Sequence, residues 1–410
     1  MSIYTDAQEI IHSALEACLP DQAVRRALEG KELGSGRVFL VALGKAAWQM
    51  ARCAAELLGP RLEQGVVVTK HGHSQGDIPR CQVFEGGHPV PDEGSFRGTR
   101  AAMELVQDLA PQDTVVLLVS GGGSALFERP LIPAEELAQL TSALLACGAD
   151  IVEMNTVRKR LSAVKGGRFA QLCAPAQVYS IVLSDILGDP LDMIASGPAY
   201  PDRSTCAQAR AIAEKYQLPL SGQARALLDQ ETPKELDNVE TVITGSVREL
   251  CSAAAAVCQR LGYETHILTD QLCCQAREAG SFLASIARTH GQEGRSLAFL
   301  AGGETVVLLT GKGLGGRNQE LALSAAEGIS GMENALIFSL GSDGTDGPTD
   351  AAGGFVDGGT KERLARQGVR IFEVLKNNDA YHALAACGGL LHTGATGTNV
   401  NDVAVLLIRR

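Results

Sequence analysis

Short apolar runs alternate with helix-like stretches along the first half of the chain. The runs lie at 37–44, 65–72, 114–127 and 179–189, and each leads into glycine or a polar loop. Continuous β-branched runs of this length are typical of strands in a parallel sheet, because helices cover both faces of such a sheet. The pattern therefore predicts an α/β fold whose ligands bind at the carboxyl ends of parallel strands.

A second set of apolar runs follows the polar, proline-containing segment 227–238, which we interpret as a linker. These runs are predicted to be strands and lie at 239–245, 263–270, 296–311, 334–344 and 402–410. In the third run, "LAFLAGGETVVLLTG", two apolar stretches flank Gly-Gly-Glu, which favours a hairpin and hence a mixed sheet. The chain is thus predicted to form two α/β domains, 1–235 and 236–410, with a cleft between them.

Composition and charge exclude several classes of protein. With 410 residues, 45% of them hydrophobic and 20% charged, the chain has the composition of a soluble globular protein. A net charge of −11 argues against a general nucleic-acid surface, and no apolar run reaches the roughly 18 residues of a membrane helix. The start, "MSIYTDAQEIIHSALEACL", predicts an amphipathic helix rather than a signal peptide. The eleven cysteines include no C-x-x-C pair, which favours a reduced, cytoplasmic protein.

Two turns at predicted strand ends are candidates for binding an anion. Lys45 follows a strand and a glycine at the start of a helix, where backbone N–H groups favour negative charge. An ordinary exposed lysine would fit this position equally well. A run of three glycines between two serines also ends a strand, and it would present several backbone N–H donors to a ligand. This run consists of Ser120, Gly121, Gly122, Gly123 and Ser124.

A concentration of basic residues stands out in this acidic chain. Arg158, Lys165 and Arg168 share one face of a predicted helix in the segment 154–169. Such a concentration indicates a local anionic partner, and we include Arg158 and Lys165 among the predicted binding residues. A solvated face paired with the surplus carboxylates explains the same pattern.

Acidic residues occur at the ends of several predicted strands. Asp185 follows "YSIVLS", Asp343 follows "ALIFSLGS", and Asp346 and Asp350 come shortly after. Carboxylates at strand ends can hold Mg²⁺, which needs only one or two of them beside phosphate oxygens and water. Glycine-rich turns also select aspartate, and Asp189 is best explained as a helix N-cap.

The segment 310–320, "TGKGLGGRNQE", resembles two glycine-rich nucleotide-binding motifs and satisfies neither. Four long or polar side chains follow its last glycine, where a dinucleotide-binding loop needs a small residue. A P-loop fails as well, because Arg317 and Asn318 replace the lysine and the hydroxyl residue. What remains is a turn that delivers the donor fork of Arg317 to a helix N-terminus. Its predicted substrate- or nucleotide-binding residues are Gly315, Gly316 and Asn318.

Nine segments together resemble one protein family, the class II glycerate 2-kinases, whose C-terminal part is called the MOFRL domain. The segments are "ALGKAA", "GGHPVPDEGS", "LVSGGGSAL", "NTVRKRLSAVKGGR", "LSDILGDPLDMIASGP", "GGET", "GLGGRNQELAL", "GSDGTDGPTDAAGG" and "TGATGTNVNDVAVLL". The resemblance implies a Rossmann-like N-terminal domain, a smaller mixed-sheet C-terminal domain and a site in the cleft between them.

The resemblance also implies the reaction and the residues that perform it. The family phosphorylates D-glycerate at the 2-hydroxyl with ATP and Mg²⁺ or another divalent metal, giving 2-phosphoglycerate and ADP. The implied functional residues are Lys45, Asp185, Glu304, Arg317, Asp343 and Asn399. We expect Lys45 and Arg317 to bind the transferring phosphoryl group. We expect Asp185 and Asp343 to act as metal ligand and base, in an order that the sequence leaves open.

Two other classes of function stay open. Some members of the family carry the name hydroxypyruvate reductase, an activity that requires an NAD(P)H site, which the 310–320 segment disfavours. A non-catalytic protein that binds a hydroxy acid would have no need for strand-end acids in both halves. The expected partners are therefore D-glycerate and a nucleotide, without nucleic acid or a membrane, and either a monomer or a homodimer fits the sequence.

Overall fold

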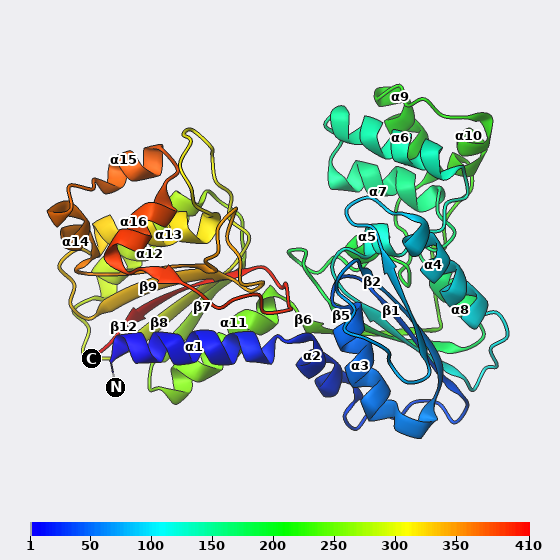
Figure 1. Cartoon of the computed structure of the whole chain (residues 1–410), viewed down its shortest axis with the longest axis horizontal. Coiled ribbons are helices and arrows are strands. Elements are labelled where there is room, and N and C mark those ends of the chain that lie inside the picture. The colour runs from blue at the N-terminus through cyan, green and yellow to red at the C-terminus, as the bar shows by residue number, and fades with distance from the viewer. Residues whose placement is uncertain (1) are drawn as a thin grey trace. The chain divides into compact units, whose positions relative to one another are not determined.

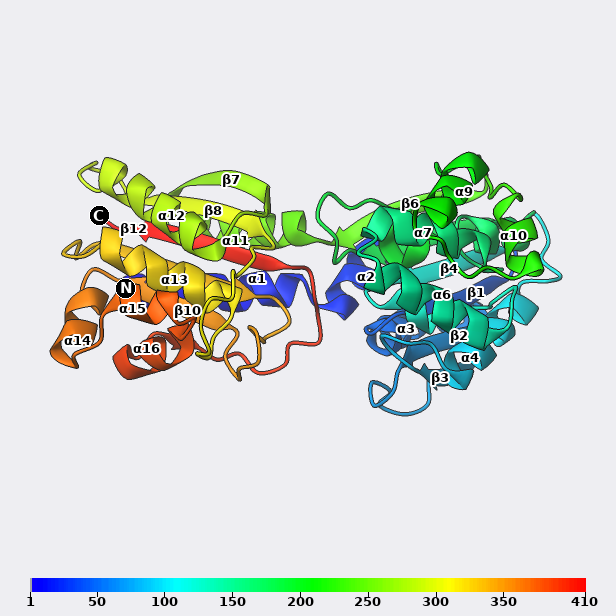
Figure 2. The ribbon, with the colours of Figure 1, turned by 90° about the horizontal axis from the view of Figure 1, so that it is seen from above.

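The computed structural model describes residues 2–410, which form two units, each built on a six-stranded sheet (Figures 1 and 2). One unit contains Ala23–Leu183 and Asp189–Thr244. The other contains the residues up to Gln22, the short segment Ser184–Gly188 and Gly245–Arg410. We call them the N-terminal and the C-terminal unit. Among the described residues, no helix is both long enough and apolar enough to cross a membrane.

The N-terminal unit contains the predicted parallel sheet, with strand order β3-β2-β1-β4-β5-β6. Its strands are β1 (Val38–Leu43), β2 (Leu62–Lys70), β3 (Cys81–Gly86), β4 (Thr114–Val119), β5 (Gln177–Leu183) and β6 (Val239–Gly245). Every residue of β1 and β4 is buried, as expected for central strands with helices on both faces. Helix α3 (Ala47–Leu58) covers one face, and α4 (Glu93–Leu105) lies against Val68 on the other.

The last strand of this sheet corrects one prediction. The run at 239–245 was expected in the second domain, yet β6 lies beside β5 at the edge of the first sheet. The backbone N–H of Val178 donates to the carbonyl of Asn238 at 2.7 Å. An apolar run specifies a strand but not its neighbour, and the polar segment before it is a connection within one unit.

A group of helices completes the N-terminal unit. It contains α6 (Ala134–Ala146), α7 (Ile151–Arg160), α9 (Cys206–Lys215) and α10 (Gly222–Leu228), at the top of this unit in Figure 1. These helices share their own apolar cluster, which includes Leu137, Leu140, Val157, Ala209 and Leu228. Three short helices lie nearer the sheet or lead into it: α2 (Pro20–Leu28), α5 (Gly123–Leu126) and α8 (Arg168–Cys173).

The C-terminal unit contains the predicted mixed sheet, with strand order β11-β10-β9-β12-β8-β7. Its strands are β7 (Glu264–Leu272), β8 (Leu297–Gly303), β9 (Ala335–Gly341), β10 (Gly353–Asp357), β11 (Leu390–Leu391) and β12 (Asp402–Ile408). The pair β7–β8 is parallel, and the other neighbours are antiparallel. The last strand of the chain, β12, therefore lies inside the sheet between β8 and β9.

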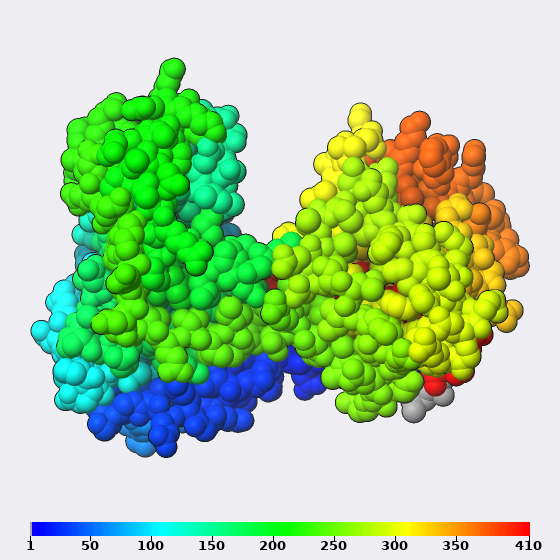
Figure 3. All heavy atoms as spheres, turned by 180° about the vertical axis from the view of Figure 1, so that it is seen from behind, coloured from blue at the N-terminus to red at the C-terminus, as the bar shows by residue number. Residues whose placement is uncertain are grey.

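Helices cover both faces of this sheet, and β12 shows how the faces divide (Figure 2). Val403, Val405 and Leu407 point to α1 (Ile3–Ala17) and α11 (Val247–Arg260). The alternate residues of the strand, from Ala404 to Ile408, point to α12 (Ala276–His290) and α13 (Arg317–Gly328). Three short helices extend that second layer: α14 (Thr360–Arg366), α15 (Ile371–Lys376) and α16 (Ala380–Cys387). Figure 3 shows the surface that β7 and α12 present, in yellow-green.

The hairpin predicted after β8 is wrong. Only β8 forms a strand there, and the segment 304–316 leaves the sheet as a loop. Its first residues continue along the end of β7, since the N–H of Val306 donates to the carbonyl of Cys274 at 3.1 Å. Farther on, Asn378 Oδ1 accepts from the N–H groups of Thr310 at 2.7 Å and Gly311 at 2.9 Å. The apolar run thus continues past its strand into an anchored loop.

Candidate active site

The loop ends at the N-terminus of α13, which a distant aspartate caps. Asp346 Oδ1 accepts from the backbone N–H of Asn318 at 3.1 Å, and its Oδ2 accepts from that of Gln319 at 2.8 Å. These N–H groups belong to the first turn of a helix, where no backbone acceptor is available to them. Gly316 precedes the helix because a Cβ there would overlap Asp346, well inside 3.0 Å. The capped turn therefore fixes the position of Arg317, the first residue of α13.

Two carboxylates hold the Arg317 guanidinium. Its Nε donates to Asp402 Oδ2 at 2.5 Å and its Nη2 to Asp402 Oδ1 at 3.0 Å. Its Nη1 donates to Glu304 Oε1 at 2.7 Å. Burial alone would lower the pKa of Arg317, but Asp402 and Glu304 outweigh it, so the pKa lies above its ordinary value. Arg317 therefore stays charged.

Burial lowers the pKa of a cation, but it raises the pKa of two nearby acids. It raises the pKa of Asp346 to about 6, although the N–H groups of Gln319 and Asn318 stabilise its ionised form. It also raises the pKa of Asp402, more than the ion pair with Arg317 lowers it. Both carboxylates are thus paired and nevertheless costly to ionise.

Glu304, Arg317 and Asp346 border a cavity of about 850 Å³ that lies wholly within the C-terminal unit. Its charged lining consists of Glu304, Lys312, Arg317, Glu320, Asp343 and Asp346. Its apolar lining includes Leu187, Val306, Val307 and Leu309. The excess of carboxylates over cations means that an anion entering this cavity needs an accompanying cation, or the withdrawal of a carboxylate, to be accommodated.

Sequence reasoning assigned no role to two residues at this site, Asn401 and Asp402. Asn401 has a positive φ of 64° and is buried, and its Nδ2 donates to the carbonyl of Asp185 at 3.2 Å. Its own carbonyl accepts from the N–H of Ser342 at 3.0 Å, so it joins the segments of Asp185 and Asp343. The predicted Asn399 is exposed, and its Oδ1 accepts from the backbone N–H of Asn401 at 3.3 Å. The motif "TNVND" contains Asn399, Asn401 and Asp402. Their roles can be told apart only from their contacts in the structure.

The residues present fit a magnesium ion only with help from a ligand. Within residues 2–410, no three or more His, Cys, Asp or Glu side chains are grouped closely enough to hold a metal ion. Mg²⁺ is usually bound by one or two carboxylates together with substrate phosphates and water. Asp343 lines the cavity and receives hydrogen bonds from Thr345 on Oδ1, at 2.9 and 3.0 Å. A single carboxylate of this kind suits an ion that arrives with a nucleotide.

In the N-terminal unit, two turns interlock at the carboxyl ends of β1 and β4. The Lys45 N–H donates to the carbonyl of Gly121 at 2.8 Å, and Ser120 Oγ accepts from the N–H of Ala46 at 3.1 Å. Gly44 has a φ of 112°, and a Cβ there would overlap Ser120. Ser120 thus fixes the turn that presents Lys45, and its hydroxyl is engaged by the backbone.

His88 is a further residue that the sequence analysis left without a role, although "GGHPVPDEGS" contains it. A Cβ built on Gly122 would lie 3.1 Å from His88 Cδ2 and 3.2 Å from Lys45 Cγ, so both side chains flank this glycine. Burial lowers the pKa of His88, and the charges of Lys45, Lys70 and His73 lower it further. Basic side chains therefore gather at the ends of β1, β2 and β3, where an anion would be attracted.

Behind the three-glycine turn, Arg158 and Lys165 bind the backbone. Both donate to the carbonyl of Ser124, Arg158 Nη2 at 3.1 Å and Lys165 Nζ at 2.9 Å. Lys165 is fully buried beside Glu128, with Nζ 3.1 Å from Oε2, and burial lowers its pKa to about 8. The Ser124 hydroxyl lies 2.8 Å from that of Ser196. In this arrangement the two cations support the turn from inside the protein.

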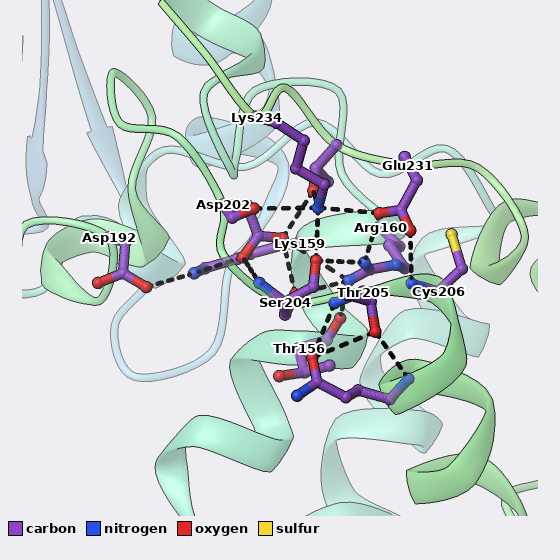
Figure 4. Close-up of polar contacts among 12 residues, drawn as sticks. Thr156, Lys159, Arg160, Asp192, Asp202, Ser204, Thr205, Cys206, Glu231 and Lys234 are labelled. Atoms are coloured by element: carbon purple, nitrogen blue, oxygen red, sulfur yellow. Dashed lines mark hydrogen bonds and ion pairs between the residues drawn. The ribbon is translucent and has the colours of Figure 1, made fainter.

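The neighbouring Lys159 and Arg160 belong to a buried network (Figure 4). Lys159 Nζ lies 3.2 Å from Asp192 Oδ2 and 3.2 Å from Asp202 Oδ1, and Arg160 Nη2 lies 3.2 Å from Glu231 Oε2. The sequence analysis offered an anionic partner or a solvated face for this basic segment. Lys159 and Arg160 fit neither explanation. They are buried, and acids from the segments 189–204 and 229–234 neutralise them inside the protein.

Comparisons with known proteins agree with this architecture. A family profile described as a domain of unknown function, DUF4147, matches residues 6–229, and the MOFRL family profile matches residues 297–402. The chain is 52% identical to a D-glycerate 2-kinase of Thermotoga maritima over 98% of this chain and 97% of the relative. It is 38% identical to an Agrobacterium vitis protein provisionally named a hydroxypyruvate reductase, over 98% and 93% of the two chains.

A crystal structure of a glycerate kinase from Thermotoga maritima superimposes with a TM-score of 0.95 at 52% identity, covering 98% of this chain and 99% of that one. The match therefore covers nearly the whole length of both chains. The chain therefore belongs to the class II glycerate 2-kinase family.

Proposed function

We propose that this protein transfers a phosphoryl group from ATP to the 2-hydroxyl of D-glycerate, giving 2-phosphoglycerate and ADP. The observation that carries the proposal is its full-length similarity to a D-glycerate 2-kinase. The geometry of the C-terminal unit supports it, because a permanently charged arginine borders a cavity of about 850 Å³. Phosphoryl transfer depends mainly on positioning and on stabilising charge, which is what such an arginine supplies.

The proposed roles follow from the chemistry of each residue. Arg317 would balance the charge of the transferring phosphoryl group through the donors of its planar guanidinium. Lys45, presented by the interlocked turns, would bind an anionic group of a substrate. Asp343 is the better candidate for a metal ligand because it lines the cavity, which leaves Asp185 as the candidate base. A Mg²⁺ ion held there would neutralise phosphate charge, which the acidic lining of the cavity does not do.

Other predicted residues are proposed as supports for the site. Gly315, Gly316 and Asn318 shape the capped end of α13, and Asn399 fixes the backbone of Asn401. The turn Ser120–Ser124 shapes the surroundings of Lys45, with Arg158 and Lys165 behind it. We further propose that the protein works in the reducing cytoplasm, where the buried thiols of Cys18, Cys53, Cys173, Cys206, Cys251 and Cys258 would serve as small apolar side chains.

The loop geometry weighs against the hydroxypyruvate reductase alternative. A dinucleotide-binding loop offers its backbone N–H groups to a pyrophosphate. Here the N–H groups of residues 310–314 all donate to acceptors on Asn377, Asn378 and Asp379. No backbone donor in that stretch is left for a cofactor.

The test is ³¹P NMR of the product formed from D-glycerate and Mg-ATP. A doublet coupled to the C2 proton of glycerate supports the proposal, and Arg317→Ala should lower kcat by at least about 100-fold while circular dichroism stays unchanged. Oxidation of NADH with hydroxypyruvate, without ADP release from Mg-ATP and D-glycerate, would favour the reductase instead. Calorimetric binding of D-glycerate without turnover would favour a binding protein.

A further inference from the structure

The two carboxylates that hold Arg317 differ in how firmly they are themselves held. Asp402 is the first residue of β12, a strand paired on both sides, opposite Gly303 of β8 and Gly341 of β9. Its side chain is only 8% exposed. The Glu304 side chain is 46% exposed, on the loop that leaves β8. One partner is part of the sheet framework, and the other is at the surface.

Asp402 fixes the direction of the guanidinium. It accepts from Nε and Nη2, which lie on the same edge of the guanidinium plane, so the paired bonds fix that plane relative to the sheet. With this edge occupied, the side of the guanidinium that carries Nη1 and the second N–H of Nη2 is left to face another group. A strand end embedded between two neighbours holds such a carboxylate more rigidly than a loop does.

Glu304 binds Nη1 on this remaining side. Its Oε1 lies 2.7 Å from Nη1, the geometry that a phosphate oxygen would also adopt. Apart from Arg317, the only hydrogen bond that the described residues give the Glu304 carboxylate is a long one of 3.4 Å, from Asn401 Nδ2. An exposed ion pair of this kind contributes little, so the carboxylate can leave without a large penalty.

We infer that Asp402 is a positioning residue that aims Arg317, and that Glu304 takes the place of a substrate phosphate group until that group displaces it. The inference rests on the proposed function, in which Arg317 receives a phosphoryl group. It assigns opposite effects to two acids that contact the same arginine. Removing the charge of Glu304 strengthens phosphate binding, and removing that of Asp402 weakens it.

Binding of inorganic phosphate without metal, followed by ³¹P NMR titration, tests this directly. Glu304→Gln should lower the dissociation constant about two- to fivefold, the range for an exposed ion pair. Asp402→Asn should raise it, and should lower kcat with Mg-ATP and D-glycerate about 10- to 100-fold through misdirection of Arg317. In an Arg317→Ala background the gain from Glu304→Gln should vanish, because the effect acts through the guanidinium.

Two matched variants separate these roles from general effects. Glu327→Gln removes a carboxylate of similar exposure, paired with Lys361 at 2.6 Å, from the other end of α13. Asp357→Asn breaks another buried pair in the same unit, in which Asp357 Oδ1 and Oδ2 lie 3.0 and 3.2 Å from Arg363. Both controls should leave phosphate binding and kcat within about twofold of the wild type, whatever their effect on the melting temperature.

The outcomes separate this inference from the proposed function. If the wild type does not phosphorylate D-glycerate but the two acids still shift phosphate binding in opposite directions, the proposed function fails and the inference stands. If the enzyme is active but Glu304→Gln weakens phosphate binding, or its gain persists without Arg317, the inference is overturned. It is equally overturned if Asp357→Asn lowers kcat as much as Asp402→Asn, since the Asp402 effect would then be structural.

Discussion

Two adjacent glycines allow a sharp test of how Arg317 is presented. A Cβ on Gly315 would lie 3.3 Å from Ala380 N and 3.4 Å from Ala380 Cβ, contacts that small shifts relieve. A Cβ on Gly316 would overlap both the carboxyl carbon and the carbonyl carbon of Asp346, well inside 3.0 Å. Neither glycine has a positive φ, so replacing either with alanine changes space and not backbone freedom.

The expected cost of Gly316→Ala follows from what Asp346 would have to release. Overpacking a buried site costs about 1–3 kcal/mol. Moving the carboxylate away also weakens its hydrogen bonds of 2.8 and 3.1 Å to the end of α13, each contributing about 1.5–3 kcal/mol. We expect a loss of about 4 kcal/mol, a drop in Tm on the order of 10 °C for a domain of this size. Gly315→Ala should lose less than about 1 kcal/mol.

Activity should also fall more for Gly316→Ala than for Gly315→Ala, because the capped turn sets the position of Arg317. A displacement of about 1 Å in such a group can lower kcat about 100-fold. Differential scanning calorimetry gives Tm, and a coupled assay of ADP release with D-glycerate and Mg-ATP gives kcat. Equal Tm and kcat values for the two alanine variants would refute the claim that Asp346 organises the end of α13.

Three further predictions concern single charges. Since burial raises the pKa of Asp346 to about 6, its ionised form costs about 3 kcal/mol at neutral pH, a cost relieved as the pH falls towards 4. Between pH 7 and pH 4, urea unfolding should show the wild type becoming more stable relative to Asp346→Asn by about 2 kcal/mol, and parallel pH profiles of the two proteins would contradict this. Lys165→Met leaves Glu128 charged and buried, so we expect a loss of about 3–5 kcal/mol that Lys165→Met/Glu128→Leu largely restores, and calorimetry showing no recovery would count against the pairing. Lys45→Met should lower kcat at least about 100-fold in the ADP-release assay with Tm unchanged, and near-normal turnover would remove Lys45 from the site.

The sequence predicted well those features that depend on local pattern. Continuous apolar runs identified the fully buried strands β1 and β4, because a parallel sheet with two covered faces needs them. The glycine-rich segment before Arg317 was predicted to end at a helix N-terminus, and α13 begins at that residue. In both cases the physical requirement lies within a few neighbouring residues.

Features that depend on distant partners were missed. The strand β6 belongs to the first sheet because it pairs with β5, and the apolar pattern of a strand does not specify its pairing partner. Asp402 is separated from Arg317 by 85 positions, and nothing in "TNVND" distinguishes a residue that aims an arginine from an exposed one. The basic segment around Arg160 looked like a surface because its acidic partners come from later segments of the chain.

The order of segments in the C-terminal unit has a consequence for how the chain becomes folded on the ribosome. Helix α1 is synthesised first, yet Ile10, Ile11 and Leu15 pack against a sheet whose inner strand, β12, is synthesised last. The N-terminal unit needs nothing beyond Thr244, so it can finish folding while α1 still lacks its partner. A fragment starting at Gly245 would carry the MOFRL segment without α1, one of the two helices that cover this face of its sheet. The apolar face of α1 is therefore exposed for longer during synthesis than any other part of that core.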